Sequence, residues 1–454
     1  MIAASGATRA EWARYAAVAV IAAAVVGRTL LAWFSPWSFG YVWDLYHEGI
    51  QWAYANGRLP SAGDCWECWQ PPLLFAVAAP LYVVGRWLYP ISPWPDDYAL
   101  LPVSLLLLAA GAASLVSIWR LLRLLHISGE SRVLGFALAA ALPCFFFSSY
   151  ALEPDGLVAA LVIVFVYYLT RWFRFAGEAT AIDVVRLGVL AGLAAEAKYN
   201  GLVAAIAGVL VVAAGGARPI AWRRRVRTAA VFVAVTAIAG GWPYVRNLRA
   251  HGTPFYANGP AVSGFSLFGP RAFARYEVAT FRMRDLFALT RPDAPPGMLT
   301  DLPVYRSVWT TLHGLTWGDM GFFTNPTRHG TRYPFYQDRH VPPWLASTVL
   351  ALGVLPTALA VVGFARTARL RRYLPLTIVT AVGWAMYLQY VASQEIWALK
   401  SKYLLFLVPM YVVYAVHGTR AIAVRARWAG AALAGALTVL LVLANLYLFL
   451  FAIG

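Results

Sequence analysis

Uninterrupted apolar runs of 15 to 25 residues recur along this 454-residue chain. The hydrocarbon core of a bilayer is about 30 Å thick, and a helix needs about 20 residues to cross it. Hydrophobic residues make up 61% of the sequence and charged residues only 13%. The pattern therefore predicts an all-α polytopic membrane protein with about 11 transmembrane helices.

The arginines indicate how these helices are oriented. The net charge of +17 would suggest nucleic-acid binding in a soluble protein, but here many arginines lie in short loops between apolar runs, at 218–227, 366–373 and 420–428. Short arginine-rich loops stay on the cytoplasmic side of a membrane. We therefore place these loops in the cytoplasm and expect no nucleic-acid partner.

The loop assignments divide the chain into three parts. The first apolar run, 15–34, is too long for a signal-peptide core and is predicted to be an uncleaved transmembrane helix. Residues 1–244 form an N-terminal transmembrane module, whose first outer loop, 35–71, is predicted to hold interfacial helices. Residues 245–342 form the one larger extracytoplasmic loop, and residues 343–454 form the C-terminal transmembrane helices.

One stretch leaves two alternatives open. Three apolar segments, 72–90, 99–125 and 132–150, lie between two loops that both face outward, whereas three crossings would put those loops on opposite sides. Either 72–90, with three prolines and Arg86, lies partly in the interface, or the arginine-bearing loop at 120–132 faces outward against the usual charge bias.

The first outer loop carries a cluster of polar residues. Asp44, His47 and Glu48 follow one another at spacings of three and four residues in "YVWDLYHEG". On a helix over 42–55 these spacings bring all three side chains to one face. The simpler interpretation is an interfacial helix whose polar face meets water, and only a second acidic cluster on the same side favours a site.

Glu153 and Asp155 in "LEPDG" are that second cluster, and they stand where an apolar helix begins. Acidic groups are favoured at a helix start, and a proline is tolerated there, so capping is the structural alternative. Capping needs one acid, and here there are two. Paired carboxylates are also ligands for Mg²⁺ or Mn²⁺, which makes Glu153 and Asp155 a candidate site for a divalent cation.

Several cations face the same side of the membrane. The chain has three lysines, and Lys198 interrupts an apolar hairpin, where an ionisable group is costly and indicates function. Arg246 follows the next helix, and Lys400 and Lys402 lie in a later outer loop. For Lys198 the structural alternative is neutralisation by Glu196, which is weakened because positions two apart on a helix do not face each other. Arg246, Lys400 and Lys402 could each be a side chain that merely reaches the interface. Together they are suited to an anionic headgroup.

Cys65 and Cys68 are separated by two residues in the first outer loop. The spacing fits a disulfide or half of a metal site, and the outer compartment is oxidising. A zinc site would need further ligands that the sequence does not offer. We expect a local disulfide or two packed thiols.

The order of these features resembles the GT-C superfamily of membrane glycosyltransferases, which use polyprenyl-phosphate sugars, and especially the branch of aminoarabinose transferases and protein O-mannosyltransferases. The shared elements are listed in chain order: "VWDLYHEG", "QPPLLF", "LEPDG", "KYNGL", "WPYVRNLRAHGTPFY" and "SKYLLFLVP". The resemblance implies a GT-C-type fold. It differs from some relatives at Gln70, where they have an acidic residue before the two prolines.

The resemblance also implies roles for residues. Asp44 is the expected catalytic base that deprotonates the acceptor. Apart from the resemblance, His47 and Glu48 either orient the base or the acceptor or have no role, and the sequence leaves both alternatives open. Glu153 and Asp155 are the second acidic motif, and Lys402 with Tyr403 contacts the donor's phosphate. Lys198, Arg246 and Lys400 join them as further phosphate-binding candidates.

The expected function is therefore sugar transfer from a polyprenyl-phosphate donor to an envelope lipid or glycan, at the extracytoplasmic face of a bacterial inner membrane. The alternative is a transporter or flippase for a lipid-linked or anionic substrate, which would place polar groups near the bilayer midplane in repeated halves. The donor sugar, the acceptor and the oligomeric state are not encoded in these motifs.

Overall fold

The computed structural model describes residues 3–34, 46–65, 67–88, 98–149, 151–217, 220–256, 280–288, 307–317, 342–393 and 400–453. Within these ranges the chain forms helices and no β-strand beyond an isolated bridge between Ala62 and Cys65. The α-helices are α1 (Ala3–Phe34), α2 (Tyr46–Asn56), α3 (Leu73–Leu88), α4 (Leu101–Leu124), α5 (Gly129–Ala141), α6 (Pro143–Ser148), α7 (Pro154–Arg174), α8 (Ala181–Ala197), α9 (Leu202–Ala214), α10 (Trp222–Gly240), α11 (Trp242–His251), α12 (Met283–Ala288), α13 (Val308–Trp317), α14 (Pro343–Thr367), α15 (Leu374–Ser393), α16 (Val408–Arg425) and α17 (Arg427–Ile453). The short 3₁₀ helices are η3 (Tyr98–Leu100), η4 (Tyr199–Gly201), η8 (Arg371–Tyr373) and η10 (Ser401–Leu407).

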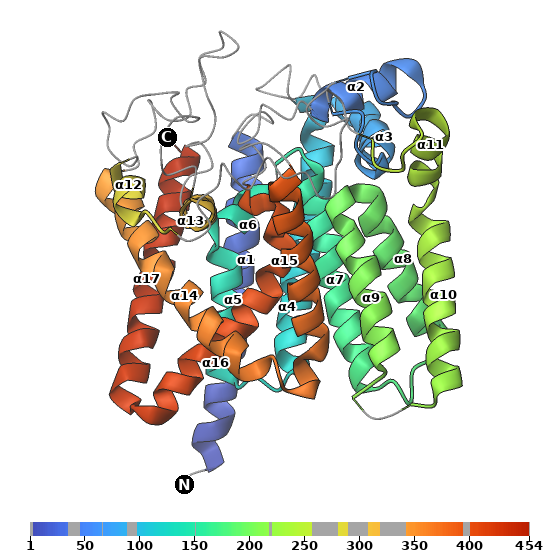
Figure 1. Cartoon of the computed structure of the whole chain (residues 1–454). Coiled ribbons are helices and arrows are strands. Elements are labelled where there is room, and N and C mark those ends of the chain that lie inside the picture. The colour runs from blue at the N-terminus through green and yellow to red at the C-terminus, as the bar shows by residue number, and fades with distance from the viewer. Residues whose placement is uncertain are drawn as a thin grey trace.

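Most of the long helices run parallel to one another in a single bundle (Figure 1). In the described ranges six are long and apolar enough to cross a membrane, and the bent pair α10–α11 raises the number to as many as seven. The six are α4, α7, α14, α15, α16 and α17, the last two of these joined by a short turn. The prediction of an all-helical polytopic membrane protein is confirmed, while the figure of about 11 spans stays a prediction.

Arginine-bearing turns gather at one end of the bundle. The turns α7–α8, α9–α10, α14–α15 and α16–α17 all lie at the end where the N-terminus is drawn (Figure 1). The opposite end carries α2, α3, α11, α12 and α13. We refer to the arginine end as the cytoplasmic end and to the opposite end as the outer end, following the positive-inside tendency.

Contacts of the α4–α5 turn bear on the alternatives left open for 72–90. His126 in this turn is hydrogen-bonded to Arg174 at 3.0 Å, and Ser128 accepts a hydrogen bond from Arg420 at 2.6 Å. Both arginines lie at the cytoplasmic end, so α4 and α5 cross in the usual sense. Helix α3, the described part of 72–90, has 16 residues, a length of about 24 Å, and this favours the alternative in which 72–90 lies partly in the interface.

Two of the expected helices are broken where the sequence carries proline. The run 132–150 divides into α5 and α6 at Leu142, which adopts an extended conformation before Pro143. A residue before proline is pushed out of the helical region, and proline itself has no N–H to donate. The run 228–244 ends at Gly240, and α11 leaves at an angle of 63° with Pro243 in its first turn.

A buried arginine joins α1 to α5 and α6. Arg28 is 1% exposed, and its guanidinium donates to Ser149 Oγ at 2.6 Å and to the carbonyl of Ala140 at 3.2 Å. Its Cζ atom lies 4.2 Å from the centre of the Phe146 ring. An arginine on an apolar helix is costly unless its nitrogens have acceptors. With a further hydrogen bond from Nη1 to the carbonyl of Ala24 at 3.1 Å, each of the three guanidinium nitrogens has one.

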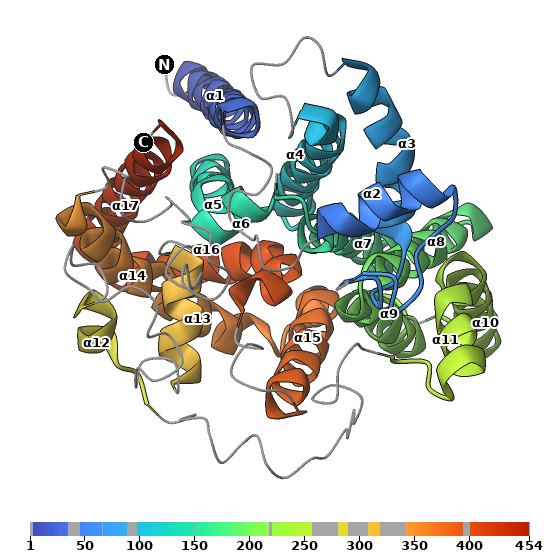
Figure 2. The same ribbon diagram turned by 90° about the horizontal axis from the view of Figure 1, so that it is seen from above.

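Helices α2 and α3 form a separate apolar cap on the outer end. Tyr46 and Ile50 of α2 pack against Phe75 and Ala78 of α3 in a cluster distinct from the main core. Seen from the outer end, α2 and α3 lie over the region of α4, α7 and α8 (Figure 2). The three-part division predicted at residues 244 and 342 stays a prediction, because much of 245–342 lies outside the described ranges.

Candidate active site

The two acids of the "LEPDG" motif begin helix α7. Glu153 is the residue before the helix, in an extended conformation, and Asp155 lies in the first turn after Pro154. Both are buried, at 1% and 0% exposure. The unpaired amide groups and the dipole of a helix stabilise negative charge at its N-terminus, which offsets part of the cost of burying two carboxylates.

Lys198 lies at the turn between α8 and α9. Helix α8 ends at Ala197, and Lys198 takes an extended conformation before η4 leads into α9. The turn is tight because residue 201 is glycine: a Cβ atom there would lie 1.9 Å from the carbonyl oxygen of Ala194. A cation at the C-terminal end of α8 is stabilised by the helix dipole.

Lys402 belongs to η10, which precedes α16. Residues on both sides of Lys402 attach η10 to the other segments: Cys144 Sγ of α6 lies 3.0 Å from Ser401 Oγ, and Asn200 donates to the carbonyl of Tyr403 at 3.3 Å. Lys402 is 1% exposed. Its ammonium group is thereby directed into the interior of the outer end.

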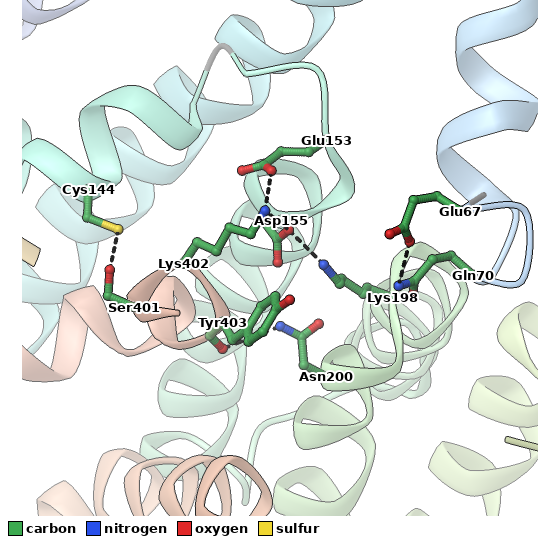
Figure 3. A network of polar contacts seen from close by, with 10 residues as sticks. All are labelled: Glu67, Gln70, Cys144, Glu153, Asp155, Lys198, Asn200, Ser401, Lys402 and Tyr403. Carbon is green, nitrogen blue, oxygen red and sulfur yellow. Dashed lines mark hydrogen bonds and ion pairs between the residues drawn. The ribbon is translucent and has the colours of Figure 1, made fainter. Parts of the chain in front are cut away.

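The four side chains form one buried network (Figure 3). Lys198 Nζ lies 2.7 Å from Asp155 Oδ2, and Lys402 Nζ lies 2.5 Å from Glu153 Oε2 and 3.6 Å from Asp155 Oδ2. Two carboxylates and two ammonium groups balance in charge. Because burying an unpaired charge costs several kcal/mol, this pairing is what allows all four groups to be buried.

Tyr403 forms one wall of the network. Its ring centre lies 4.7 Å from Lys198 Nζ and 5.9 Å from the Nζ atoms of both Lys400 and Lys402. Tyr46, the first residue of α2, lies on another side, with its ring centre 6.0 Å from Lys198 Nζ. The start of α2 therefore reaches the network, and this is the part of the site nearest in sequence to Asp44.

Asp44, the predicted catalytic base, lies outside the described residues. His47 and Glu48 are described: both are half-buried on α2, whose observed start at Tyr46 agrees with a helix in this region. The structure thus brings together Glu153, Asp155, Lys198, Lys402 and Tyr403, with Lys400 nearby. The roles predicted for Asp44, His47 and Glu48 stay predictions.

Arg246 lies on α11 and makes contacts of its own. Its guanidinium donates to the carbonyl of Pro60 at 3.3 Å and lies 5.4 Å from the Trp242 ring centre. Arg246 and Arg249 line an open groove of about 810 Å³ at the α10–α11 bend, together with apolar residues such as Ile238 and Val245. Trp242, also in this groove, donates to Glu196 Oε1 at 2.7 Å, which connects the groove to the end of α8.

The side chains around Glu153 and Asp155 do not suit a divalent cation. Lysine ammonium groups occupy the positions beside both carboxylates, and a metal ion placed there would meet two positive charges within a few ångströms. Within the described ranges no group of three His, Cys, Asp or Glu residues is arranged to hold a metal ion. The two lysines therefore disfavour the Mg²⁺ or Mn²⁺ ion that the sequence suggested at Glu153 and Asp155.

Two residues of the site were not expected from the sequence. Glu67 and Gln70 are 7% and 5% exposed, and Figure 3 shows their side chains reaching toward Lys198 from the side opposite the acids. Cys65 and Cys68 form a disulfide, one of the two states expected for them. An acid enclosed between two cysteines was the available signal, since the disulfide fixes the residue between them.

Solved structures provide the comparison with known proteins, because no family model and no curated protein matches the chain. The archaeal oligosaccharyltransferase AglB from Archaeoglobus fulgidus, in complex with an inhibitory peptide and a dolichol-phosphate, is similar at 12% identity and a TM-score of 0.48, over 97% of this chain and 55% of that chain. ArnT from Cupriavidus metallidurans bound to undecaprenyl phosphate is similar at 14% identity and a TM-score of 0.37, over 90% of this chain and 77% of that chain.

Both TM-scores are below 0.5, so neither likeness assigns a family to this chain. The chain spans about half the length of the archaeal oligosaccharyltransferase. Similarity at this level assigns neither an activity nor a substrate to the chain. Its function is therefore inferred from the chemistry of its own residues.

Proposed function

We propose that the protein is an inverting glycosyltransferase that moves a hexose or pentose from a polyprenyl-phosphate donor to an envelope lipid or glycan. The reaction takes place at the extracytoplasmic face of a bacterial inner membrane. The observation that carries this proposal is the buried network of Glu153, Asp155, Lys198 and Lys402 at the outer ends of the helices. A donor whose lipid tail lies in the bilayer would hold its phosphate and its reactive carbon at that level.

The reaction needs few catalytic groups. An oxygen of the acceptor hydroxyl attacks the anomeric carbon, the bond from that carbon to the phosphate oxygen breaks, and the polyprenyl phosphate leaves with both electrons. The hydroxyl proton passes to a carboxylate base. Because phosphate is a good leaving group, one base and cations near the phosphate suffice, and positioning supplies much of the remaining rate.

In this proposal Asp44 is the base. It precedes by two residues the helix whose first residue, Tyr46, lies beside Lys198. His47 and Glu48, one and two residues further along, would orient the base or the acceptor. The support is the sequence motif together with the location of the start of α2.

The cations are proposed to hold the donor phosphate. An ammonium group has three N–H donors, so Lys198 can contact a phosphate oxygen while it keeps its bond to Asp155. Lys402 is enclosed between the two acids, and its contribution would be to the local potential and to the placement of Tyr403. Arg246 and Lys400 are more open, and they are proposed as the direct contacts to the outer oxygens.

A transporter or flippase remains the alternative from a different class. It would need polar groups near the bilayer midplane, whereas Glu153, Asp155, Lys198 and Lys402 all stand at helix ends: before α7, in its first turn, after α8 and before α16. This location favours chemistry at the membrane surface.

The experiment is complementation of a deletion strain with variants, read by mass spectrometry of envelope lipids and glycans. Asp44→Asn should lower the rate of product formation by about 10²- to 10⁴-fold, the usual worth of a general base, at unchanged protein level and thermal midpoint. Glu178→Gln, an exposed acid at the cytoplasmic end, is the matched control. Wild-type product levels with Asp44→Asn would remove Asp44 as the base.

A further inference from the structure

The polar atoms of the site that lack a hydrogen bond are mainly acceptors. In the described part of the site, Asp155 Oδ1, Asn200 Oδ1 and the amide oxygen of Gln70 are buried and have no hydrogen-bond partner. The ammonium groups, in contrast, already contact carboxylates. A site with unused acceptors is complementary to a ligand that brings donors, and sugar hydroxyl groups are donors.

The orientation of the Gln70 amide follows from its neighbour. Gln70 Nε2 donates to Glu67 Oε2 at 3.3 Å. A carboxylate can only accept, so it selects the NH₂ end of the amide and turns the carbonyl end away from itself. The carbonyl oxygen of Gln70 is therefore held as an acceptor by Glu67. Figure 3 shows both side chains on the Lys198 side of the turn.

Glu67 is in turn fixed by the disulfide. Cys65 and Cys68 are bonded, and the turn is closed by backbone hydrogen bonds from Cys68 N to Cys65 O at 3.3 Å and from Gln70 N to Glu67 O at 3.1 Å. The Trp69 ring stacks on Tyr199 at a centroid distance of 5.9 Å, and Tyr199 donates to the carbonyl of Trp69 at 3.4 Å. The turn is thus attached to the hairpin that carries Lys198.

We propose that Gln70 is a specificity-determining residue that accepts a hydrogen bond from a hydroxyl group of the transferred sugar, and that Glu67 is its positioning residue, held by the Cys65–Cys68 disulfide. The proposal rests on the proposed function. It adds that the turn 65–70 recognises the sugar part of the donor. It separates the sugar, read by acceptors on the turn 65–70, from the phosphate, which needs cations.

The test compares the binding of two probes to the purified full-length chain in detergent. One probe is farnesyl phosphate, and the other is a set of farnesyl-phosphate-linked hexoses and pentoses. The wild type should bind at least one sugar-bearing lipid more tightly than farnesyl phosphate. Gln70→Ala should reduce that preference about tenfold, the worth of one hydrogen bond to a buried acceptor, and leave the affinity for farnesyl phosphate unchanged.

Two further variants keep the test decisive. Gln70→Met preserves the side-chain volume and removes the acceptor, so it should behave like Gln70→Ala even if the smaller residue disturbs packing. Glu67→Gln can donate as well as accept, so it should lower the sugar preference about three- to tenfold because Gln70 is no longer held in one orientation.

Reduction of the disulfide provides an independent arm. Treatment with a phosphine reductant should lower the sugar preference of the wild type. It should have no further effect on Glu67→Gln or on the double variant Cys65→Ser with Cys68→Ser. In these variants the contacts that position Gln70, from the disulfide through Glu67, are already broken.

The outcomes separate this proposal from the proposed function. Binding of farnesyl phosphate with no preference for any sugar-bearing lipid would overturn the role of Gln70 while supporting a polyprenyl-phosphate partner. Equal loss of both probes in Gln70→Met would make Gln70 a structural residue and also overturn it. Binding of neither probe by the wild type would overturn both.

Discussion

Lys402 Nζ lies 2.5 Å from Glu153 Oε2, although 249 residues separate them in the chain. The same ammonium group lies 3.6 Å from Asp155, which is bonded in turn to Lys198. Three segments that the sequence places far apart are therefore held together by one set of charges. Each charge lowers the free-energy cost of burying the others. Removal of one member is therefore expected to lower the stability of the protein strongly.

Lys402→Met tests this interdependence. The variant leaves Glu153 and Asp155 buried with Lys198 as the cation that remains among the four, and breaking a buried pair costs about 3–5 kcal/mol. We expect a large drop in the thermal midpoint in detergent. Adding Glu153→Leu should recover most of the loss, because the pair is then replaced by apolar groups. A double variant no more stable than Lys402→Met would contradict the pairing.

Gly201→Ala tests the tight turn that presents Lys198. The new Cβ atom would meet the Ala194 carbonyl oxygen at 1.9 Å, so the backbone must shift, at a cost of about 1–3 kcal/mol. The expected result is a lower thermal midpoint together with a loss of product formation. Gly177→Ala is the matched control, because nothing lies within 4 Å of its Cβ position. Equal effects of the two substitutions would argue against the close approach of α8 and η4.

Arg246→Gln tests the proposed phosphate contact on α11. Within the described ranges Arg246 has no salt bridge to an acid, so its charge is available to a ligand, and one charge-assisted hydrogen bond contributes about 1.5–3 kcal/mol. The dissociation constant for a polyprenyl phosphate should rise roughly 10- to 150-fold. Arg58→Gln is the control, since Arg58 lies on the same side and already pairs with Asp64 at 3.8 Å. The prediction fails if the two variants bind the lipid equally well.

His47 gives a pH dependence of stability. Burial lowers the pKa of its imidazole from 6.5 to about 4, because a buried ring disfavours the charged form. Between these values the unfolded chain binds a proton that the folded chain does not, so stability falls as the pH falls from 6.5 toward 4. Thermal midpoints measured across this window should show a smaller acid-side decline in His47→Gln. An identical decline in both proteins would assign it to other groups.

The secondary structure was largely predictable from the sequence. Apolar runs fix the long helices, since each must satisfy its own backbone hydrogen bonds inside a bilayer. Arginine-rich turns predicted which helix ends lie together, and Figure 1 shows them at one end of the bundle. The sequence also indicated that Glu153, Asp155, Lys198 and Lys402 lie on one side. These properties depend on the composition of short stretches of sequence, so they can be predicted without the tertiary structure.

Other features needed the fold. The sequence did not show that the α4–α5 turn lies beside Arg174 and Arg420, at the end of the bundle opposite α3. Nor did it show that Lys402 would pair with Glu153 and Lys198 with Asp155, or that Glu67 would hold Gln70 beside them. Composition determines that charged groups near a membrane must be paired or exposed. Which groups pair depends on distances between helices remote in sequence, and only tertiary packing sets those distances.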